Sequence, residues 1–230
     1  MSQVLEIKNV SKKYGNIRAL DGVSLNVERG NVYGILGPNG SGKTTLLGII
    51  LNIINANQGT YSWFGKPPSK HSRKKIGALL ETANFYPYLS AYQNLKVTAT
   101  IKGVPYSDID RVLQIVGLAD RKNSKFKGFS FGMQQRLAMA SVLLGNPEVL
   151  VLDEPTNGLD PQGIAEVRNL IIKVAGEGKT IIIASHILDE IEKVCTHVGI
   201  LKTGRLMVSG AMGEIVKNQS LETKFLELTA

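Results

Sequence analysis

The 230-residue sequence lacks the features that define several classes of protein. Its single cysteine, Cys195, excludes an internal disulfide framework and a cysteine-based metal cluster. No apolar run reaches the roughly 18 to 20 residues of a membrane-spanning helix, because Gly48 and Asn52 interrupt the most apolar stretch, residues 46–54. The N-terminus has no basic-then-apolar signal pattern. We therefore expect a cytoplasmic protein that reaches a membrane only through a partner.

The one cysteine lies among apolar residues. Ile187, Leu188, Ile191 and Val194 precede Cys195 at helical spacing. This setting predicts a small core side chain. The alternative is a reactive thiol, and the two interpretations differ in whether the sulfur is buried.

Acidic residues are also scarce. The chain has 19 Asp and Glu against 27 Lys and Arg, which gives a net charge of +8. Nucleic acid, anionic lipid headgroups or an acidic protein could each account for such an excess. The basic residues are scattered, and their densest groups, at 12–13, 70–75 and 121–127, are short. We expect a solvated basic surface and no nucleic-acid partner.

What the sequence does contain is an alternation of strand-like and helix-like segments, which is typical of the α/β class. The expected strands are 4–10, 19–27, 32–36, 149–152, 180–184 and a hairpin over 198–208, and the expected helices are 44–54 and one with Pro161 in its first turn. We predict one domain over 1–230, with a mixed, partly parallel sheet and an N-terminal antiparallel β subdomain. Residues 84–145 have helical spacing and predict a helical subdomain, whereas 216–230 form a tail with little pattern.

A glycine-rich loop follows the expected strand at 32–36. It reads Gly37, Pro38, Asn39, Gly40, Ser41, Gly42, Lys43 and Thr44, which fits G-x-x-x-x-G-K-[ST], and Thr45 comes next on the expected helix. Glycines let backbone N–H groups turn toward a phosphate, and the start of a helix adds its positive end. Lys43 supplies charge to the β- and γ-phosphates, and Thr44 offers a hydroxyl to Mg²⁺. The pattern predicts a P-loop NTPase core that binds ATP and Mg²⁺.

Two acids, Asp153 and Glu154, follow the expected strand at 149–152. In doubly wound sheets, ligands bind at the carboxyl ends of strands. Alternation along a strand would send the two side chains to different sides. We expect Asp153 to hold Mg²⁺, directly or through water, and Glu154 to orient and deprotonate the attacking water. The alternative is an exposed acidic turn that caps the strand.

With this loop and this acid pair, the chain resembles the ATP-binding cassette (ABC) family over about residues 3–215. Tyr14 stands where the family has an aromatic ring that stacks on adenine. The segment at 129–136 resembles the family signature L-S-G-G-Q. The resemblance implies that Ser130 and Gly132 contact the γ-phosphate of a nucleotide bound to a second copy of the chain.

Further motifs follow in the order that the family has. Residues 157–160, Asn-Gly-Leu-Asp, resemble the loop that touches the partner subunit beside the catalytic site. His186 matches the family's switch histidine, which would contact the γ-phosphate and help to hold the water or Glu154. Phe131 and Met133 depart from the commonest form of the signature.

One position departs from the family in an informative way. After residues 76–80 the family has a glutamine that senses Mg²⁺, whereas this chain has Glu81. A carboxylate can still ligate Mg²⁺, so Thr44, Asp153 and Glu81 form the expected metal set. Glu81 together with Asn-Phe-Tyr-Pro at 84–87 resembles the exporters linked to bacteriocin or peptide-antibiotic immunity.

The resemblance also implies an assembly. Two copies would close over two ATP molecules as a homodimer, with Glu154, His186 and Lys43 as the catalytic residues. A separate polytopic permease at the inner face of the cell membrane would convert closure and hydrolysis into export. Two alternatives remain open, a family member that remodels a ribosome or DNA, and a nucleotide-sensing module without turnover. The single cassette without a coiled-coil insertion disfavours the first, and intact Glu154 and His186 disfavour the second.

Overall fold

The structure is a computed structural model that describes residues 3–80, 84–217 and 219–229. Its strands are β1 (Gln3–Tyr14), β2 (Ile17–Glu28), β3 (Val32–Leu36), β4 (Gln58–Trp63), β5 (Ile76–Leu79), β6 (Val149–Asp153), β7 (Thr180–Ser185), β8 (His197–Lys202) and β9 (Arg205–Ala211). Its helices are α1 (Lys43–Ile50), α2 (Lys70–Lys74), α3 (Ala91–Lys102), α4 (Asp108–Ile115), α5 (Phe131–Leu143), α6 (Pro161–Gly176), α7 (Leu188–Val194), α8 (Met212–Ile215) and α9 (Leu221–Thr229), with 3₁₀ turns at Ala119–Arg121 and Phe126–Gly128.

A six-stranded sheet forms the centre of the fold, in the order β5-β6-β7-β3-β8-β9. In this sheet β5, β6, β7, β3 and β8 run parallel to one another. The edge strand β9 is antiparallel to β8. The register pairs Leu36 with Ser185 and Asp153 with Ala184, so β3, β6 and β7 end together. The loops that follow these three strands therefore start at one edge of the sheet, where ligands bind in folds of this kind.

A second, three-stranded sheet has the order β2-β1-β4 and is antiparallel throughout. It confirms the expected antiparallel β subdomain at the N-terminus. The sequence pattern did not predict β4, because burial in this strand is confined to its last residue, Trp63. An exposed strand without an apolar face has little of the alternation that marks a strand.

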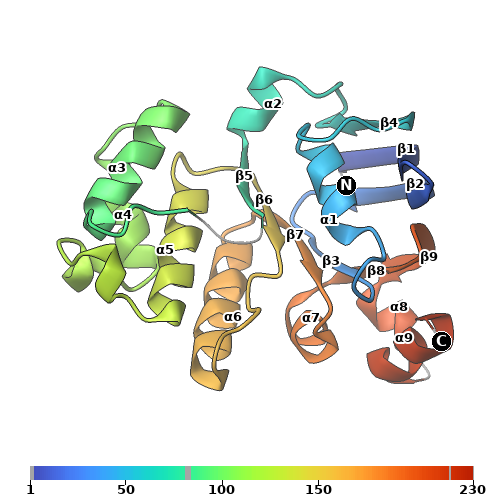
Figure 1. Cartoon of the computed structure of the whole chain (residues 1–230). Helices are drawn as coiled ribbons and strands as arrows, with labels where there is room; N and C mark the ends of the chain where they lie inside the picture. The colour runs from blue at the N-terminus through green and yellow to red at the C-terminus, as the bar shows by residue number, and fades with distance from the viewer. Residues whose placement is uncertain (1–2, 81–83, 218, 230) are drawn as a thin grey trace.

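Hydrophobic side chains cover both faces of the central sheet, as alternation along its strands requires. In β3, Tyr33 and Ile35 pack with α1 and the N-terminal sheet, whereas Val32 and Leu36 pack in the core that includes α5, α6 and α7. Helices α3, α4 and α5 gather at the opposite end of the molecule from β1, β2 and β4 (Figure 1). The α/β class is thus confirmed.

Helix α1 ends at Ile50, and the prediction of a helix as far as Ile54 is wrong. Asn52 adopts a φ of 60°, in the left-handed region that asparagine enters more readily than most residues. The backbone N–H of Ile54 then turns back to the Gly48 carbonyl, at 3.0 Å. This local turn closes the helix despite the apolar residues that follow it.

The C-terminal residues also form helices where the sequence showed little pattern. Helix α9 lies within the predicted tail, and its first residue, Leu221, is fully buried in the core. The rest of α9 is intermediate or exposed. Phe225 and Leu228 pack against the same core, so α9 has a short apolar face at helical spacing that the prediction of a tail missed.

Candidate nucleotide site

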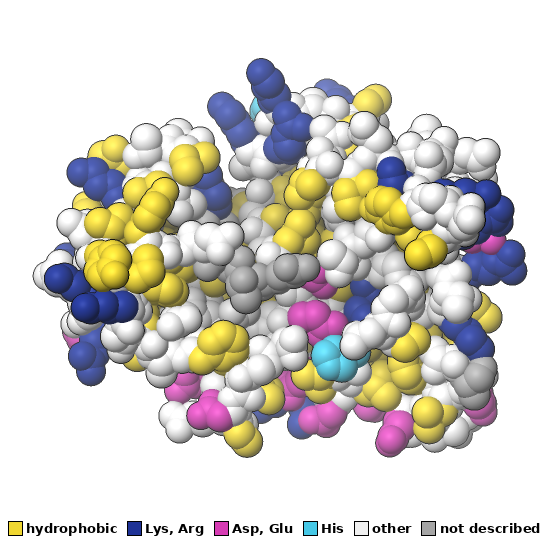
Figure 2. Space-filling model, in the orientation of Figure 1, with side chains coloured by type: hydrophobic (Ala, Val, Ile, Leu, Met, Phe, Trp, Pro, Cys, Tyr) yellow, Lys and Arg dark blue, Asp and Glu magenta, His cyan; other side chains and the backbone are white. Residues whose placement is uncertain are grey.

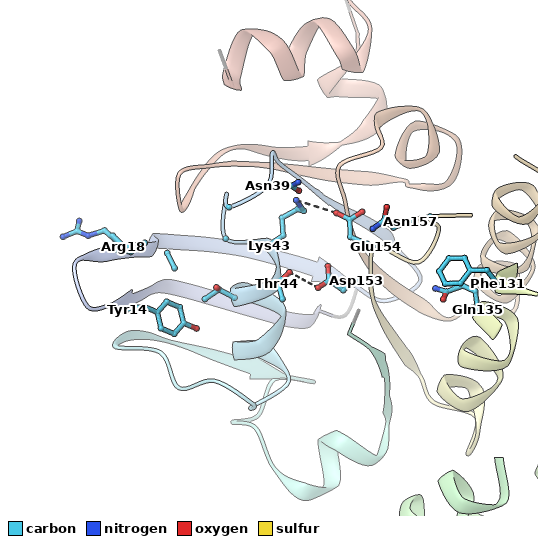
Figure 3. Close-up of a pocket in the computed structure, with 16 residues that line it drawn as sticks. Tyr14, Arg18, Asn39, Lys43, Thr44, Phe131, Gln135, Asp153, Glu154 and Asn157 are labelled. Atoms are coloured by element: carbon cyan, nitrogen blue, oxygen red, sulfur yellow. Dashed lines mark hydrogen bonds and ion pairs between the residues drawn. The ribbon is translucent and has the colours of Figure 1, made fainter. Parts of the chain in front are cut away.

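A cavity of about 720 Å³ lies where the loops after β3 and β6 meet. It is lined by nine of the predicted residues, Tyr14, Asn39, Gly40, Gly42, Lys43, Thr44, Thr45, Asp153 and Glu154. Figure 3 shows the labelled members of this group approaching the cavity from the end of β1, the loop before α1, the first turn of α1 and the end of β6. Gly37, Pro38 and Ser41 belong to the same loop but do not line the cavity.

Two glycines in the loop are required by its shape. A Cβ on Gly37 would lie 2.3 Å from Ser41 Oγ and 2.5 Å from the Leu201 carbonyl oxygen. Gly42 has a φ of 106°, and a Cβ there would lie 2.5 Å from the Ala19 carbonyl oxygen. A residue with a Cβ at position 37 or 42 would therefore distort this loop.

The ammonium group of Lys43 is buried within this loop, and the residue is 6% exposed. It donates hydrogen bonds to the carbonyl oxygens of Gly37 at 2.7 Å and Pro38 at 3.4 Å. It also lies 3.7 Å from Glu154 Oε1 (Figure 3). A single positive charge is thus held between the phosphate-loop backbone and an acid at the end of β6.

Glu154 connects two parts of the site. Its Oε1 lies 2.9 Å from His186 Nδ1, and its Oε2 is buried without a hydrogen-bond partner among the described residues. His186 does not itself line the cavity. It contacts Glu154, which does. A carboxylate oxygen in this setting can accept a hydrogen bond from a water molecule.

The two acids diverge for a reason other than the one expected. Strand β6 ends at Asp153, so alternation along a strand does not extend to Glu154. Glu154 instead has a φ of 47°, which is uncommon for a residue other than glycine. Its N–H donates to the Ala184 carbonyl at 2.9 Å, and its carbonyl accepts from the Asn157 N–H at 3.1 Å. A tight turn, rather than strand geometry, gives the two carboxylates different partners.

Thr44 and Asp153 form a pair of oxygen ligands that suits Mg²⁺. Thr44 Oγ1 donates a hydrogen bond to Asp153 Oδ2 at 2.9 Å, and Asp153 is 2% exposed. Hydroxyl and carboxylate oxygens are ligands that Mg²⁺ accepts when nucleotide phosphates complete its coordination. No group of three or more His, Cys, Asp or Glu side chains forms a metal site among the described residues. Glu81, the third predicted ligand, lies outside them.

Tyr14 lies at one side of the cavity and is 46% exposed. Lys12 Nζ stands 5.1 Å from the centre of its ring. Ile17, Arg18 and Ala19, across the hairpin turn from Tyr14, also line the cavity. The sequence did not indicate them, although their position beside Tyr14 in a hairpin is a signal that could have done so.

The two predicted signature residues lie outside this cavity. Ser130 caps helix α5, where its Oγ accepts a hydrogen bond from the Met133 N–H at 3.3 Å. Ser130 is exposed and Gly132 is partly exposed at this helix start. Neither lines the cavity of its own chain.

Their neighbours do line it. Phe131 and Gln135 of α5, with Asn157 and Gly158 of the loop after β6, complete the cavity. In Figure 3 Phe131 and Gln135 lie on the side away from Tyr14. The sequence marked Phe131 only as a departure from a motif and gave Gln135 no role. Both reach the cavity because α5 packs against the loop after β6, where Gln135 Nε2 donates to the Pro155 carbonyl at 2.7 Å.

Comparisons with known proteins agree with this geometry. The ABC transporter family model matches residues 20–157. The lantibiotic transport ATP-binding protein SrtF of Streptococcus pyogenes is 40% identical over 227 residues, which cover 96% of this chain and 99% of that protein. The bacitracin transport ATP-binding protein BcrA of Enterococcus faecalis is 38% identical over 230 residues, which cover 98% of this chain and 75% of that protein.

Solved structures give the same result. The structure of cbiO1 from Clostridium perfringens, described as part of the ABC transporter complex cbiONQ, has a TM-score of 0.85 and is 32% identical, with 95% of this chain and 92% of that chain covered. Within the described part of this chain, no helix has the length and apolar character to cross a bilayer. The family match extends over more than half of the chain and includes both the phosphate loop and the acid pair. The chain therefore belongs to the ABC transporter family, as one of its ATP-binding, P-loop ATPase subunits.

Proposed function

We propose that this subunit hydrolyses Mg-ATP in the cavity between the phosphate loop and β6, and that hydrolysis drives export through a separate membrane protein. The observation that carries the proposal is the position of Glu154, with one oxygen between Lys43 and His186 and the other buried without a partner among the described residues. In this proposal Glu154 orients and deprotonates the attacking water. His186 holds Glu154 and contacts the γ-phosphate.

The other predicted residues would hold the nucleotide. The loop backbone and the start of α1 would surround the phosphates, with Lys43 at the β- and γ-phosphates. Tyr14 would stack on adenine, which contributes about 1–3 kcal/mol in base stacking elsewhere. Thr44 and Asp153 would hold Mg²⁺, which would neutralise charge on the phosphates during transfer.

ATP would bring two copies of the chain together as a homodimer. Ser130 and Gly132 lie at an accessible helix start outside their own cavity, so a nucleotide on a second copy can approach them. A helix start favours a phosphate. The signature would thus contact the γ-phosphate in the partner's site, while residues 157–160 would meet the partner beside it.

The membrane subunit would bind at an apolar groove of about 350 Å³. The groove is lined by Leu51, Ile53, Ile76, Ala78 and Leu80, with Arg73 among them. Ile53 is 67% exposed, so its apolar side chain is accessible to a partner at this groove. An apolar groove suits one face of an amphipathic helix. The ATPase would then lie on the cytoplasmic face of the membrane, held there by its permease.

The substrate we propose is a peptide antibiotic. This rests on the relatives, which are named as lantibiotic and bacitracin transport ATP-binding proteins. Deletion of the gene that encodes this chain should lower the resistance of its native cell to a lantibiotic or to bacitracin. Unchanged resistance to both classes would contradict this substrate.

We also propose a division of the chain. Residues 1–230 would form a single ATPase domain, in which 84–145 act as a helical subdomain that moves on dimer closure and 216–230 form a C-terminal tail. Helices α3, α4 and α5 support this division, because they gather at one end of the molecule (Figure 1).

A Glu154→Gln variant tests the catalytic assignment. The amide cannot accept a proton from water, so we expect kcat to fall by about 10²–10⁴-fold. ATP binding should persist, and size-exclusion chromatography with Mg-ATP should show a lasting dimer. Glu148→Gln is the matched control, because Glu148 pairs with Arg29 and Lys75 at the other end of β6. Hydrolysis at the wild-type rate by Glu154→Gln would remove Glu154 from the proposed role.

The tagged Glu154→Gln protein also tests the partner. It should capture a polytopic membrane protein in stoichiometric amount from detergent-solubilised membranes with Mg-ATP. Ribosomal proteins or DNA-bound factors in its place would favour a remodelling ATPase. ATP binding without turnover by the wild-type protein would favour a nucleotide sensor.

A further inference from the structure

The positive charge of the chain comes from one part of the sequence. Residues 29–107 hold nine of the 27 Lys and Arg and only one of the 19 acids, Glu81, whereas the rest of the chain holds 18 of each. Residues 65–80 alone contain five Lys and Arg and no acid. The short basic group at 70–75 is therefore the densest part of a longer stretch that carries the excess positive charge, and it coincides with α2.

Helix α2 presents this charge to solvent. Lys66, Lys70, Arg73 and Lys74 are exposed, and no ion pair joins any of them to a described residue. Lys75, by contrast, forms an ion pair of 2.8 Å. The residues at 70, 73 and 74 share one helix face, because residues three and four apart are neighbours on a helix. Figure 2 shows the resulting group of basic side chains projecting over α2, at the top of the molecule.

The stability of α2 does not account for this arrangement. Like charges three and four residues apart repel each other. Lys70 also occupies the first position of the helix, where the helix dipole disfavours a cation. The helix is held by a capping box, in which Ser69 Oγ accepts from the Ser72 N–H at 3.1 Å. The cations thus repel one another on a fixed turn, and an external negative surface would relieve that repulsion.

We propose that Lys66, Lys70 and Lys74 bind anionic phospholipid headgroups at the membrane surface. Lysines carry compact charges on flexible stems and suit a fluid surface of many anions, whereas a fixed bidentate partner would favour arginine. Clusters of four to eight basic residues are attracted to anionic leaflets by roughly 1 kcal/mol per residue in general. The acids visible on this face of the molecule lie mainly toward the end that carries α6 and α7 (Figure 2). This charge asymmetry would turn α2 toward the membrane.

The lipid contact goes beyond the proposed function, since it uses neither the nucleotide cavity nor a permease. It can therefore be measured with the purified subunit and vesicles of phosphatidylcholine, with and without phosphatidylglycerol. Wild type should float with the anionic vesicles only, and high salt should release it. A triple variant, Lys66→Gln, Lys70→Gln and Lys74→Gln, should lower the partition coefficient on the order of 100-fold, since each charge contributes about a factor of five.

The matched control removes three lysines from the other dense basic segment, as Lys122→Gln, Lys125→Gln and Lys127→Gln. It should bind anionic vesicles nearly as wild type does, and both triple variants should keep their ATPase rate in solution. Arginine at positions 66, 70 and 74 should retain binding even where glutamine impairs folding. Equal losses in both glutamine variants, or equal binding to neutral vesicles, would overturn the proposal. Failure of the wild-type protein to bind anionic vesicles would also overturn the proposal. An acidic protein segment would then be the better partner for α2. ATPase activity without vesicles separates these outcomes from a failure of the proposed function.

Discussion

At the scale of single residues, the chemistry of the site depends on one backbone torsion angle. Glu154 has a φ of 47°, and residues in such sparsely populated conformations cost about 1–3 kcal/mol in general. The hydrogen bond from its N–H to the Ala184 carbonyl helps to hold this turn. The turn lets Asp153 stay with Thr44 while Glu154 meets His186. We infer that the strain is retained because the proposed hydrolysis needs both carboxylates in separate roles.

Cys195 shows the opposite case, a residue whose chemistry is suppressed by its position. Burial raises the pKa of its thiol to about 12, and the residue is 6% exposed. The thiolate is the reactive form, so at about pH 8 the native protein should not react with iodoacetamide. After unfolding in guanidinium, one thiol per chain should react, which mass spectrometry can count. Rapid labelling of the native protein would contradict the core interpretation and support a reactive thiol.

At the scale of elements, helix ends decide where the segments around the site begin. Helix α3 opens with a capping box, in which Ser90 Oγ accepts from the Gln93 N–H and Gln93 Oε1 accepts from the Ser90 N–H. Gln93, the first glutamine after Glu81, is thereby occupied within α3. Helix α4 follows Ser107, whose side chain makes no cap hydrogen bond. Each serine directly precedes its helix, but Ser90 has an extended backbone and Ser107 a helical one.

This difference gives a test of the cap. Ser90→Ala should lower the free energy of unfolding by about 1 kcal/mol, because it leaves a first-turn N–H of α3 without its side-chain acceptor. Urea denaturation followed by circular dichroism measures the change. Ser107→Ala should leave stability nearly unaltered, since no cap hydrogen bond is lost. Equal effects of the two substitutions would argue against the cap as the cause.

At the scale of the whole molecule, three surfaces have separate roles in our proposals. The cavity binds nucleotide, the apolar groove receives the permease, and the α2 cations contact lipid. Arg73 belongs both to the basic face of α2 and to the groove, so the last two surfaces are adjacent. Their adjacency is consistent with one membrane-facing region.

Ile53→Asp tests the groove. Burial of a carboxylate in an apolar contact costs desolvation energy, so we expect loss of co-purification with the membrane subunit. The ATPase rate of the isolated variant should match that of wild type, because Ile53 does not line the nucleotide cavity. Ile172→Asp on α6 is the matched control, since Ile172 is 47% exposed and outside the groove. Equal capture of the permease by Ile53→Asp would assign the contact to another surface.

Much of the fold and site was predictable from local sequence. Short apolar runs marked β3, β6 and β7, because strands buried on both faces need apolar residues at every position. The glycines, Lys43 and Thr44 were recognisable because phosphate binding by a loop and a helix start depends on adjacent residues. In the structure Thr44 Oγ1 lies 2.9 Å from Asp153 Oδ2, because β3 and β6 end at the same edge of the sheet.

The remaining features depend on pairs of residues far apart in the chain. Only packing brings Phe131 and Gln135 of α5 to the cavity, and only the pairing of β6 with β7 gives the Glu154 N–H its acceptor on Ala184. Glu154 and His186 meet for the same reason, 32 residues apart in sequence. The sequence by itself determined the chemistry of the phosphate loop and the identity of the acids. The tertiary structure decided which side chains face them, because sheet register and helix packing depend on contacts that no local pattern encodes.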